Sequence, residues 1–207
     1  MNIVLHEPGI ALNTGNIGRT CVASGTSLHL IRPYGFRINE KEIARAGMDY
    51  WHRLNLHEYI DYEDFCARNF PVQALPVPGS SLQAGPNVQA DPTVQAGSTV
   101  QVSSSQNTLP ASAGPARVWY ATTKAHNTYA DVQFGPDDFI MFGNESRGIP
   151  EEILAEHPES CIRIPMAEGE RSLNLANSVA IVLYEALRQQ GFPGLATKGE
   201  LHRLTWK

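Results

Sequence analysis

The order of apolar and polar segments at the start of the chain is the feature that most constrains its fold. The four segments are an apolar run, a loop with two glycines, a helical stretch closed by Gly25 and a second apolar run, at residues 2–5, 8–16, 17–24 and 27–31. A strand, a short helix and a second strand predict a βαβ unit, and therefore parallel strand pairing. Parallel sheets bind ligands at the carboxyl ends of their strands. The loop that contains Asn13 and Asn16 therefore lies where a site is expected.

A second stretch, residues 162–187, has the same order of strand, polar loop and helix near the other end of the sequence. A short β-branched strand stops at Pro165, a polar loop with Gly169 follows, and a helix begins near Ser172. The helix is predicted from apolar residues at helical spacing, which are Leu175, Val179, Val182, Leu183 and Ala186. Polar side chains at 172, 174 and 177 near the helix start have two possible roles: they hold a substrate, or they satisfy the helix end.

Two further strands end in polar loops between these stretches. Residues 117–121 run into Thr122 and Lys124, and residues 138–142 run into a polar turn at 143–148, after which Pro150 begins a helix. In a parallel sheet these ends lie at one edge, so the loops are expected to converge into one pocket.

The middle of the sequence changes composition abruptly. Residues 71–116 contain seven prolines, no aromatic residue and one charged residue, Asp91. Such a segment cannot bury enough apolar surface to offset its ordering entropy, so it is predicted to be a disordered insert. The rest is of ordinary size for one α/β domain. We therefore expect a single domain at 1–194, interrupted by the insert at 71–116 and followed by a C-terminal tail at 195–207.

Composition excludes several classes of protein. No apolar run is long enough to cross a bilayer and no secretory leader opens the sequence, so a soluble cytoplasmic protein is expected. Three cysteines without C-x-x-C spacing indicate buried free thiols rather than bridges or metal ligands, and no metal site is expected. The net charge of −5 argues against general coating of nucleic acid, so any RNA contact must be local.

Three motifs, in order, carry a resemblance to a known family. They are Asn-Thr-Gly-Asn-x-x-Arg at 13–19, Phe-Gly-Asn-Glu-Ser-Arg-Gly-Ile-Pro at 142–150, and Ile-Pro-Met at 164–166 with Ser-Leu-Asn-Leu-Ala-Asn-Ser at 172–178. Together they resemble the motifs of the SPOUT RNA 2'-O-methyltransferases. The resemblance covers residues 2–70 and 117–194, and leaves out the insert and the tail.

The resemblance implies a fold and an assembly. The fold is α/β, a mostly parallel sheet with helices on both faces, whose C-terminal segment threads a trefoil knot. The small size, the opening Asn-Ile-Val-Leu-His-Glu-Pro and Ala-Gly-Met-Asp-Tyr at 46–50 most resemble the family members that methylate the ribose 2'-hydroxyl of cytidine or uridine 34 in tRNA, so this activity is expected here. The implied partners are the tRNA anticodon stem-loop and a second copy of the chain, as a homodimer.

The resemblance also implies a cofactor, S-adenosylmethionine, with S-adenosylhomocysteine as product. Carried over residue by residue, its pocket is expected to be lined by Ala121, Thr122, Gly143, Asn144, Ile164, Met166, Ser172 and Leu173. Glycine lets backbone approach a ligand closely, and apolar side chains pack on adenine.

Four residues are expected to act on the ribose. Arg19 steers the target phosphate or hydroxyl, Asn13 and Asn174 orient it, and Glu145 positions Arg19 or its loop. A guanidinium does not readily give up its proton, so Arg19 is expected to stabilise the developing alkoxide while water or a substrate phosphate accepts the proton.

Two other functions remain open at this point. One is 2'-O-methylation at another tRNA position or in ribosomal RNA, because the pocket motifs specify ribose chemistry rather than the base. The other is a non-catalytic RNA-binding protein on the same scaffold.

Overall fold

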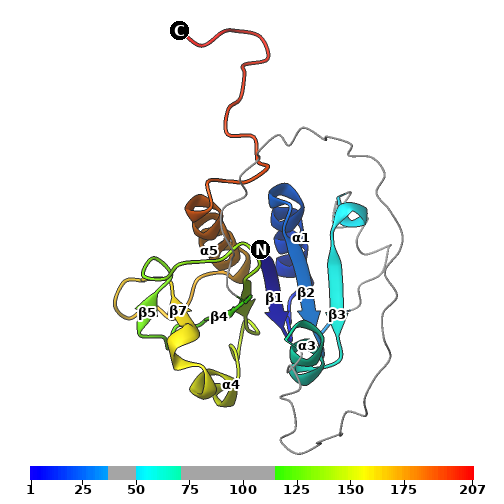
Figure 1. Cartoon of the computed structure of the whole chain (residues 1–207), viewed down its shortest axis with the longest axis vertical. Helices are drawn as coiled ribbons and strands as arrows, with labels where there is room; N and C mark the ends of the chain where they lie inside the picture. The colour runs from blue at the N-terminus through cyan, green and yellow to red at the C-terminus, as the bar shows by residue number, and fades with distance from the viewer. Residues whose placement is uncertain (37–49, 71–114) are drawn as a thin grey trace, which may run out of the picture.

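The centre of the molecule is one parallel β-sheet of seven strands in the order β3-β2-β1-β6-β4-β7-β5. A computed structural model describes residues 1–36, 50–70 and 115–207 (Figure 1). The strands are β1 (Asn2–His6), β2 (Ser27–Ile31), β3 (Leu56–Tyr59), β4 (Val118–Ala121), β5 (Asn127–Thr128), β6 (Phe139–Phe142) and β7 (Cys161–Arg163). Every ladder between neighbouring strands is parallel, as the βαβ opening predicted.

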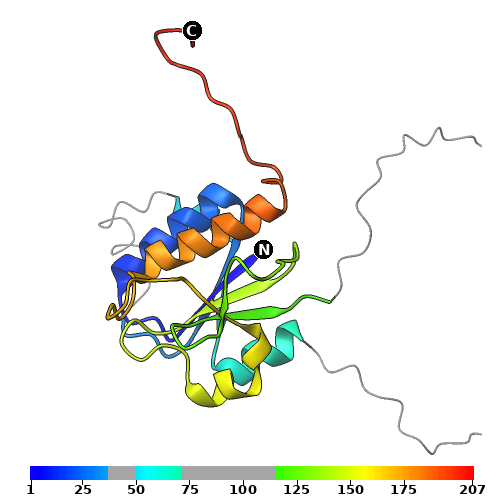
Figure 2. The ribbon, with the colours of Figure 1, turned by 90° about the vertical axis from the view of Figure 1, so that its left-hand side faces the viewer.

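Helices cover both faces of this sheet, which confirms the predicted α/β class. The helices are α1 (Ala11–Ser24), α3 (Tyr62–Asn69), α4 (Glu151–Glu156) and α5 (Leu175–Gln189), with short 3-10 turns η1 (Trp51–Arg53) and η2 (Pro158–Ser160). Figure 2 shows α1 and α5 side by side on one face, and α3 and α4 on the other. Whether the chain threads a trefoil knot stays a prediction, as does the division into one domain, an insert and a tail.

Alternating side chains of the strands supply a separate core for each face. In β1, Ile3 and Leu5 belong to the cluster under α1 and α5, whereas Val4 belongs to the cluster under α3 and α4. All three are fully buried, because successive side chains of a strand point to opposite faces and both faces are covered.

The register places the carboxyl ends of the central strands level with one another. Leu5 pairs with Phe142, and Phe142 pairs with Ala121, which in turn pairs with Ile162. The loops that follow β1, β6, β4 and β7 therefore leave the sheet at the same edge, and this edge carries the site.

Helices α1 and α5, which cover one face of the sheet, both begin at different residues from those predicted. Helix α1 starts at Ala11, so Asn13 lies inside a helix rather than in a loop; Ile10 precedes it without a side-chain cap, which removes the usual sequence signal of a start. Helix α5 starts at Leu175, and its cap is Asn174 rather than Ser172: the Asn174 side chain accepts hydrogen bonds from the next helical amides.

The other predicted elements fall into two groups. The sequence also predicts a strand at 54–59 and a short helix at 61–68, and these are present as β3 and α3, whereas the two-residue β5 was not predicted. The sequence further predicts a short helix at 40–47, which lies outside the described residues, as does the insert apart from residues 115 and 116. No helix in the described part of the chain is both long and apolar enough to span a bilayer.

Candidate functional site

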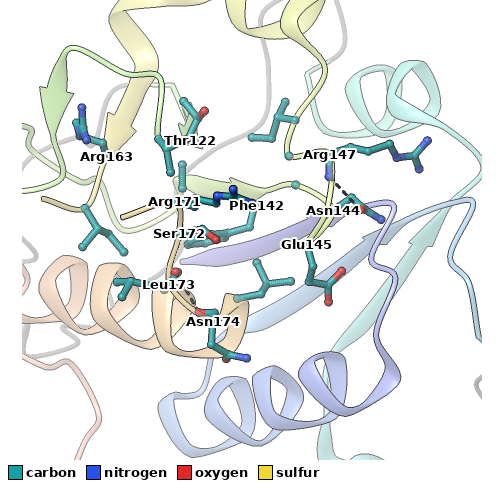
Figure 3. A pocket seen from close by; sticks show the side chains of 18 of the residues that line it. Thr122, Phe142, Asn144, Glu145, Arg147, Arg163, Arg171, Ser172, Leu173 and Asn174 are labelled. Carbon is teal, nitrogen blue, oxygen red and sulfur yellow. Dashed lines mark hydrogen bonds between the residues drawn. The ribbon is translucent and has the colours of Figure 1, made fainter. Parts of the chain in front are cut away.

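A cavity of about 650 Å³ opens at the carboxyl edge of the sheet (Figure 3). Three segments far apart in sequence form its walls: the turn after β4, the loop after β6, and the segment that joins β7 to α5. All eight residues predicted to bind the cofactor line it, namely Ala121, Thr122, Gly143, Asn144, Ile164, Met166, Ser172 and Leu173. The predicted convergence of strand ends is therefore present in the fold.

A chain of hydrogen bonds joins three of the four predicted catalytic residues. Asn174 Nδ2 donates to Asn13 Oδ1 at 3.1 Å, and Asn13 Nδ2 donates to Glu145 Oε1 at 2.9 Å. The other carboxylate oxygen of Glu145 accepts from the Gly9 amide at 2.8 Å. Asn13 is only 7% exposed, although it lines the cavity. These bonds tie the starts of α1 and α5 to the loop after β6, so each of the three side chains positions the others.

Arg19, the fourth predicted catalytic residue, is not among the residues that line this cavity in the described part of the chain. It lies later in α1, and its guanidinium lies over the Tyr50 ring, 4.9 Å from the centroid. The Tyr50 hydroxyl in turn donates to the Gly15 carbonyl at 2.6 Å. Tyr50 is buried, so it packs within the domain and at the same time supports Arg19.

The loop after β6 is folded so tightly on itself that it needs a glycine at its start. A Cβ added to Gly143 would lie 2.1 Å from the carbonyl carbon of Gly148, which no relaxed structure tolerates. Asn144 closes the same turn, because its carbonyl accepts from the Gly148 amide at 2.8 Å and its Nδ2 donates to the Glu7 carbonyl at 2.7 Å. Close approach at Gly143 is thus required by the chain itself, before any ligand is considered.

Cationic side chains surround the cavity mouth. Those that line it are Lys124, Arg147, Arg163 and Arg171. Arg147 forms an ion pair with Glu7 at 2.8 Å, and Lys124 pairs with Glu151. The Lys124 ammonium holds the pKa of the Glu151 carboxyl below its usual range through this hydrogen bond. An anionic ligand therefore meets several donors despite the net negative charge of the whole protein.

The described residues contain no group of three or more His, Cys, Asp or Glu side chains arranged to hold a metal ion. The three cysteines are free thiols; Cys21 and Cys161 are buried, whereas Cys66 is partly exposed. Burial raises the pKa of the Cys21 thiol to about 12.

A comparison with known protein families identifies the family of this chain. The sequence profile of the SpoU rRNA Methylase family matches residues 1–89 and 90–184, which include every predicted site residue. The chain belongs to the SpoU rRNA Methylase family.

A relative of known name and a solved structure are both similar to this chain over most of its length. The tRNA (cytidine(34)-2'-O)-methyltransferase of Yersinia pestis is 36% identical over 199 residues, which cover 96% of this chain and 99% of the relative. A structure described as giving insights into "the 2-OH methylation of C/U34 on tRNA" is 33% identical, with a TM-score of 0.64 over 92% of this chain and 95% of the other.

A more distant SpoU methyltransferase, AviRb of Streptomyces viridochromogenes in complex with the cofactor AdoMet, shares the fold. It is 18% identical, with a TM-score of 0.63 over 92% of this chain and 57% of the other.

Sequence reasoning missed several residues that line the SpoU-type cavity, chiefly Ile162, Arg163 and Ser178. Arg163 is the last residue of β7, at the edge where the other loops gather. Its place at a strand end was the available signal, but strand ends are difficult to locate from sequence to within one residue.

Proposed function

We propose that this protein transfers a methyl group from S-adenosylmethionine to the ribose 2'-hydroxyl of cytidine or uridine 34 in tRNA, with S-adenosylhomocysteine as the second product. The observation that carries the proposal is that each of the three motifs contributes residues to one cavity, among them Asn13, Gly143 and Ser172. The names of the relatives supply the nucleotide position, and the ribose chemistry agrees with the motifs. The anticodon stem-loop is then the part of tRNA that the protein must grip, and a cytoplasmic location follows as a prediction.

The cavity fits the proposed cofactor in size and chemistry. Its volume lies within the range of small-molecule sites. Apolar side chains such as Ile164 and Leu173 line one part, suited to a purine, and the arginines of the mouth suit a carboxylate. When bound, S-adenosylmethionine supplies a methyl group activated by a sulfonium leaving group.

The protein's own contribution is alignment and charge stabilisation. The hydrogen-bonded chain of Glu145, Asn13 and Asn174 fixes the loops that must hold donor and ribose in register, which is where most of the rate can come from. Arg19, always protonated, is suited to stabilising a 2'-alkoxide as it develops, with water or a substrate phosphate as proton acceptor.

Because Arg19 does not line the cavity of its own chain, we propose that it serves the cavity of a second copy in a homodimer. Helix α1, which carries Arg19, and helix α5 also present exposed apolar side chains, among them Leu12, Ile181 and Tyr184. A two-fold interface over these helices would bury them and bring Arg19 of the partner subunit toward the site.

Mixing two inactive variants tests the shared site. Arg19→Ala removes the guanidinium, and Leu173→Arg fills the cavity. If the site is shared between subunits, an equal mixture should recover about a quarter of the wild-type rate, because half of the dimers are mixed and each has one intact site. If Arg19 acts within its own chain, the mixture should stay inactive.

Mapping ribose methylation across total tRNA from cells with and without this protein tests the substrate. Loss of 2'-O-methylation at nucleotide 34 alone supports the proposal. Loss at another tRNA position or in ribosomal RNA would replace the substrate but keep the reaction. Absence of cofactor binding in calorimetry would favour a non-catalytic RNA-binding protein. Binding of the anticodon stem-loop should weaken steeply with salt, since phosphates meet the cations of the cavity mouth.

A further inference from the structure

Two arginines that line the cavity, Arg163 and Arg171, differ in where their side chains point. Figure 3 shows the Arg171 side chain extending across the cavity toward Phe142, the last residue of β6, whereas the Arg163 side chain is directed away from it. Of these two arginines, Arg171 is therefore the one that can reach a ligand held over the end of β6.

The segment around Arg171 is held at both ends. Residues 167–170 form a tight turn, in which the amide of the last residue donates to the carbonyl of the first at 3.2 Å. Gly169 supplies the positive φ, 86°, that the third position of such a turn requires. At the other end Asn174 caps α5 and bonds Asn13. Arg171 thus lies between two fixed points of the cavity wall.

The charge of Arg171 is not neutralised within the described part of the chain, where it forms no ion pair with a carboxylate. Two other cations of the mouth are already paired, Arg147 with Glu7 and Lys124 with Glu151. A guanidinium does not lose its proton in a protein, so Arg171 brings a full positive charge into the cavity. An inward cation without a carboxylate favours a ligand that carries an anionic group.

We propose that Arg171 binds the α-carboxylate of the methyl donor. The inference rests on the proposed function, because it assigns one part of the cofactor to one residue. The carboxylate is the anionic group of S-adenosylmethionine, and a guanidinium can hold it with two parallel hydrogen bonds. It lies at the opposite end of the cofactor from the purine, for which the lining offers apolar side chains such as Ile164 and Leu173.

A phosphate of the RNA would also suit a guanidinium. The direction of the Arg171 side chain favours the cofactor, because it points inward to Phe142 rather than out to solvent. Phe142 is only 3% exposed and directly precedes Gly143 in the tight loop that forms a wall of the cavity. A small ligand can enter this space, whereas the backbone of a tRNA approaches from outside.

Calorimetry with a matched pair of ligands tests the assignment. S-adenosylhomocysteine has the carboxylate, and 5'-deoxy-5'-(3-aminopropylthio)adenosine is the same molecule without it. The wild-type chain should bind the first about 10- to 100-fold more tightly, as expected for charge-assisted hydrogen bonds. Arg171→Gln should lose this preference and bind the two ligands within about threefold of each other. Its affinity for the ligand without a carboxylate should stay the same or rise, because the ligand's ammonium no longer faces a cation.

Two further variants sharpen the measurement. Arg171→Lys keeps the charge but loses the paired geometry, so its preference should be intermediate. Arg117→Gln is the matched control, because this exposed arginine directly precedes β4, at the opposite edge of the sheet from the cavity, and its preference should equal that of the wild type. All three variants should unfold at the wild-type temperature, since both positions are exposed.

Several outcomes overturn the proposal. Arg171→Gln could keep the wild-type preference, or it could lose both ligands equally. Loss of the preference in Arg163→Gln instead would place the carboxylate at the end of β7. A wild-type preference in Arg171→Gln, combined with weaker binding of the anticodon stem-loop, would assign Arg171 to an RNA phosphate.

Failure of this assignment is distinct from failure of the proposed function. If the wild-type chain binds S-adenosylhomocysteine and methylates nucleotide 34 while Arg171→Gln keeps the preference, the assignment fails and the function stands. If the wild-type chain binds neither ligand, the proposed function fails.

Discussion

The two faces of the sheet differ in how they use their residues. Under α3 and α4 lies a closed core of rings, in which Phe65 contacts Tyr59 and Phe139 edge to face. The opposite face, under α1 and α5, carries exposed apolar side chains, and the starts of these two helices contribute to the cavity and the bonded chain of site residues at the carboxyl edge of the sheet. Residues that stabilise the fold and residues that form the site therefore lie largely on different faces of the sheet. Substitutions on one face should mainly change stability, and substitutions on the other should mainly change ligand binding.

The largest expected effect is on the closed face. Phe65→Ala should destabilise the protein by about 3–5 kcal/mol, because a fully buried ring is lost from α3. Urea denaturation measures the loss. Binding of S-adenosylhomocysteine at 15 °C should change less than about threefold, since Phe65 is not among the described residues that line the cavity. A large loss of affinity in a folded variant would show that the faces are coupled.

A buried imidazole on the same face should make stability depend on pH. His29 bonds Tyr59 at 2.8 Å and Asn2 at 3.3 Å, and burial, followed by the nearby His57, lowers its pKa from 6.5 to about 3. The unfolded chain therefore takes up a proton first as pH falls, so this stability is complete above pH 6.5 and declines down to about pH 3.

The slope should approach about 1.4 kcal/mol per pH unit, or about 3 kcal/mol by pH 4.5. Denaturation of wild type and His29→Gln across this range measures it, and the variant should show a flatter profile. His52→Gln, at an exposed position, is the control and should keep the wild-type profile. Parallel profiles for all three proteins would contradict the role given to His29.

On the functional face, Gly143→Ala should affect binding more than stability. Displacement of Gly148 by the new methyl group is expected to cost about 1–3 kcal/mol of stability and to abolish cofactor binding, because the turn after β6 forms a wall of the cavity. Calorimetry with S-adenosylhomocysteine checks this. Gly199→Ala, where an added Cβ meets nothing, should behave as wild type. Normal binding by Gly143→Ala would mean that the turn can relax.

The smallest effect is expected on the solvent side of α5. Arg188 pairs with Glu185 at 2.7 Å and, together with Gln189, holds the pKa of that carboxyl at about 2. Arg188 is nevertheless 63% exposed, so Arg188→Gln should cost less than about 1 kcal/mol in thermal denaturation. A loss above about 2 kcal/mol would show that this pair is more than a surface contact.

Sequence reasoning was most successful where local pattern and physics agree. The βαβ opening predicted parallel pairing, and three polar strand ends predicted one pocket; both follow from rules about adjacent segments. It failed at helix starts. Ile10 offers no capping side chain before α1, and helix α5, predicted to begin near Ser172, begins at Leu175 with Asn174 as its cap. Side chains at those starts depend on contacts across more than a hundred residues, such as Asn13 with Glu145, which no local pattern encodes.

Arg19 shows a different limit. Its motif indicated a catalytic residue, but motif order cannot say which copy of the chain a side chain serves. The order of the strands could not be predicted for a related reason, because the pairing of β1 with β6 joins segments that are far apart in the sequence, such as Asn2 with Phe139.

The sheet order has one further consequence for engineering. Strands β3, β2 and β1 all precede residue 71 and the other four all follow residue 114. The two groups are joined by the β1–β6 ladder, by the packing of α1 on α5, and by contacts of α3 such as Phe65 with Phe139. Cutting the chain between residues 71 and 114 would give two fragments, one with Asn13 and the other with Glu145 and Asn174. Neither fragment would hold a complete pocket, and reassembly of the halves would switch methylation on, as in a split reporter.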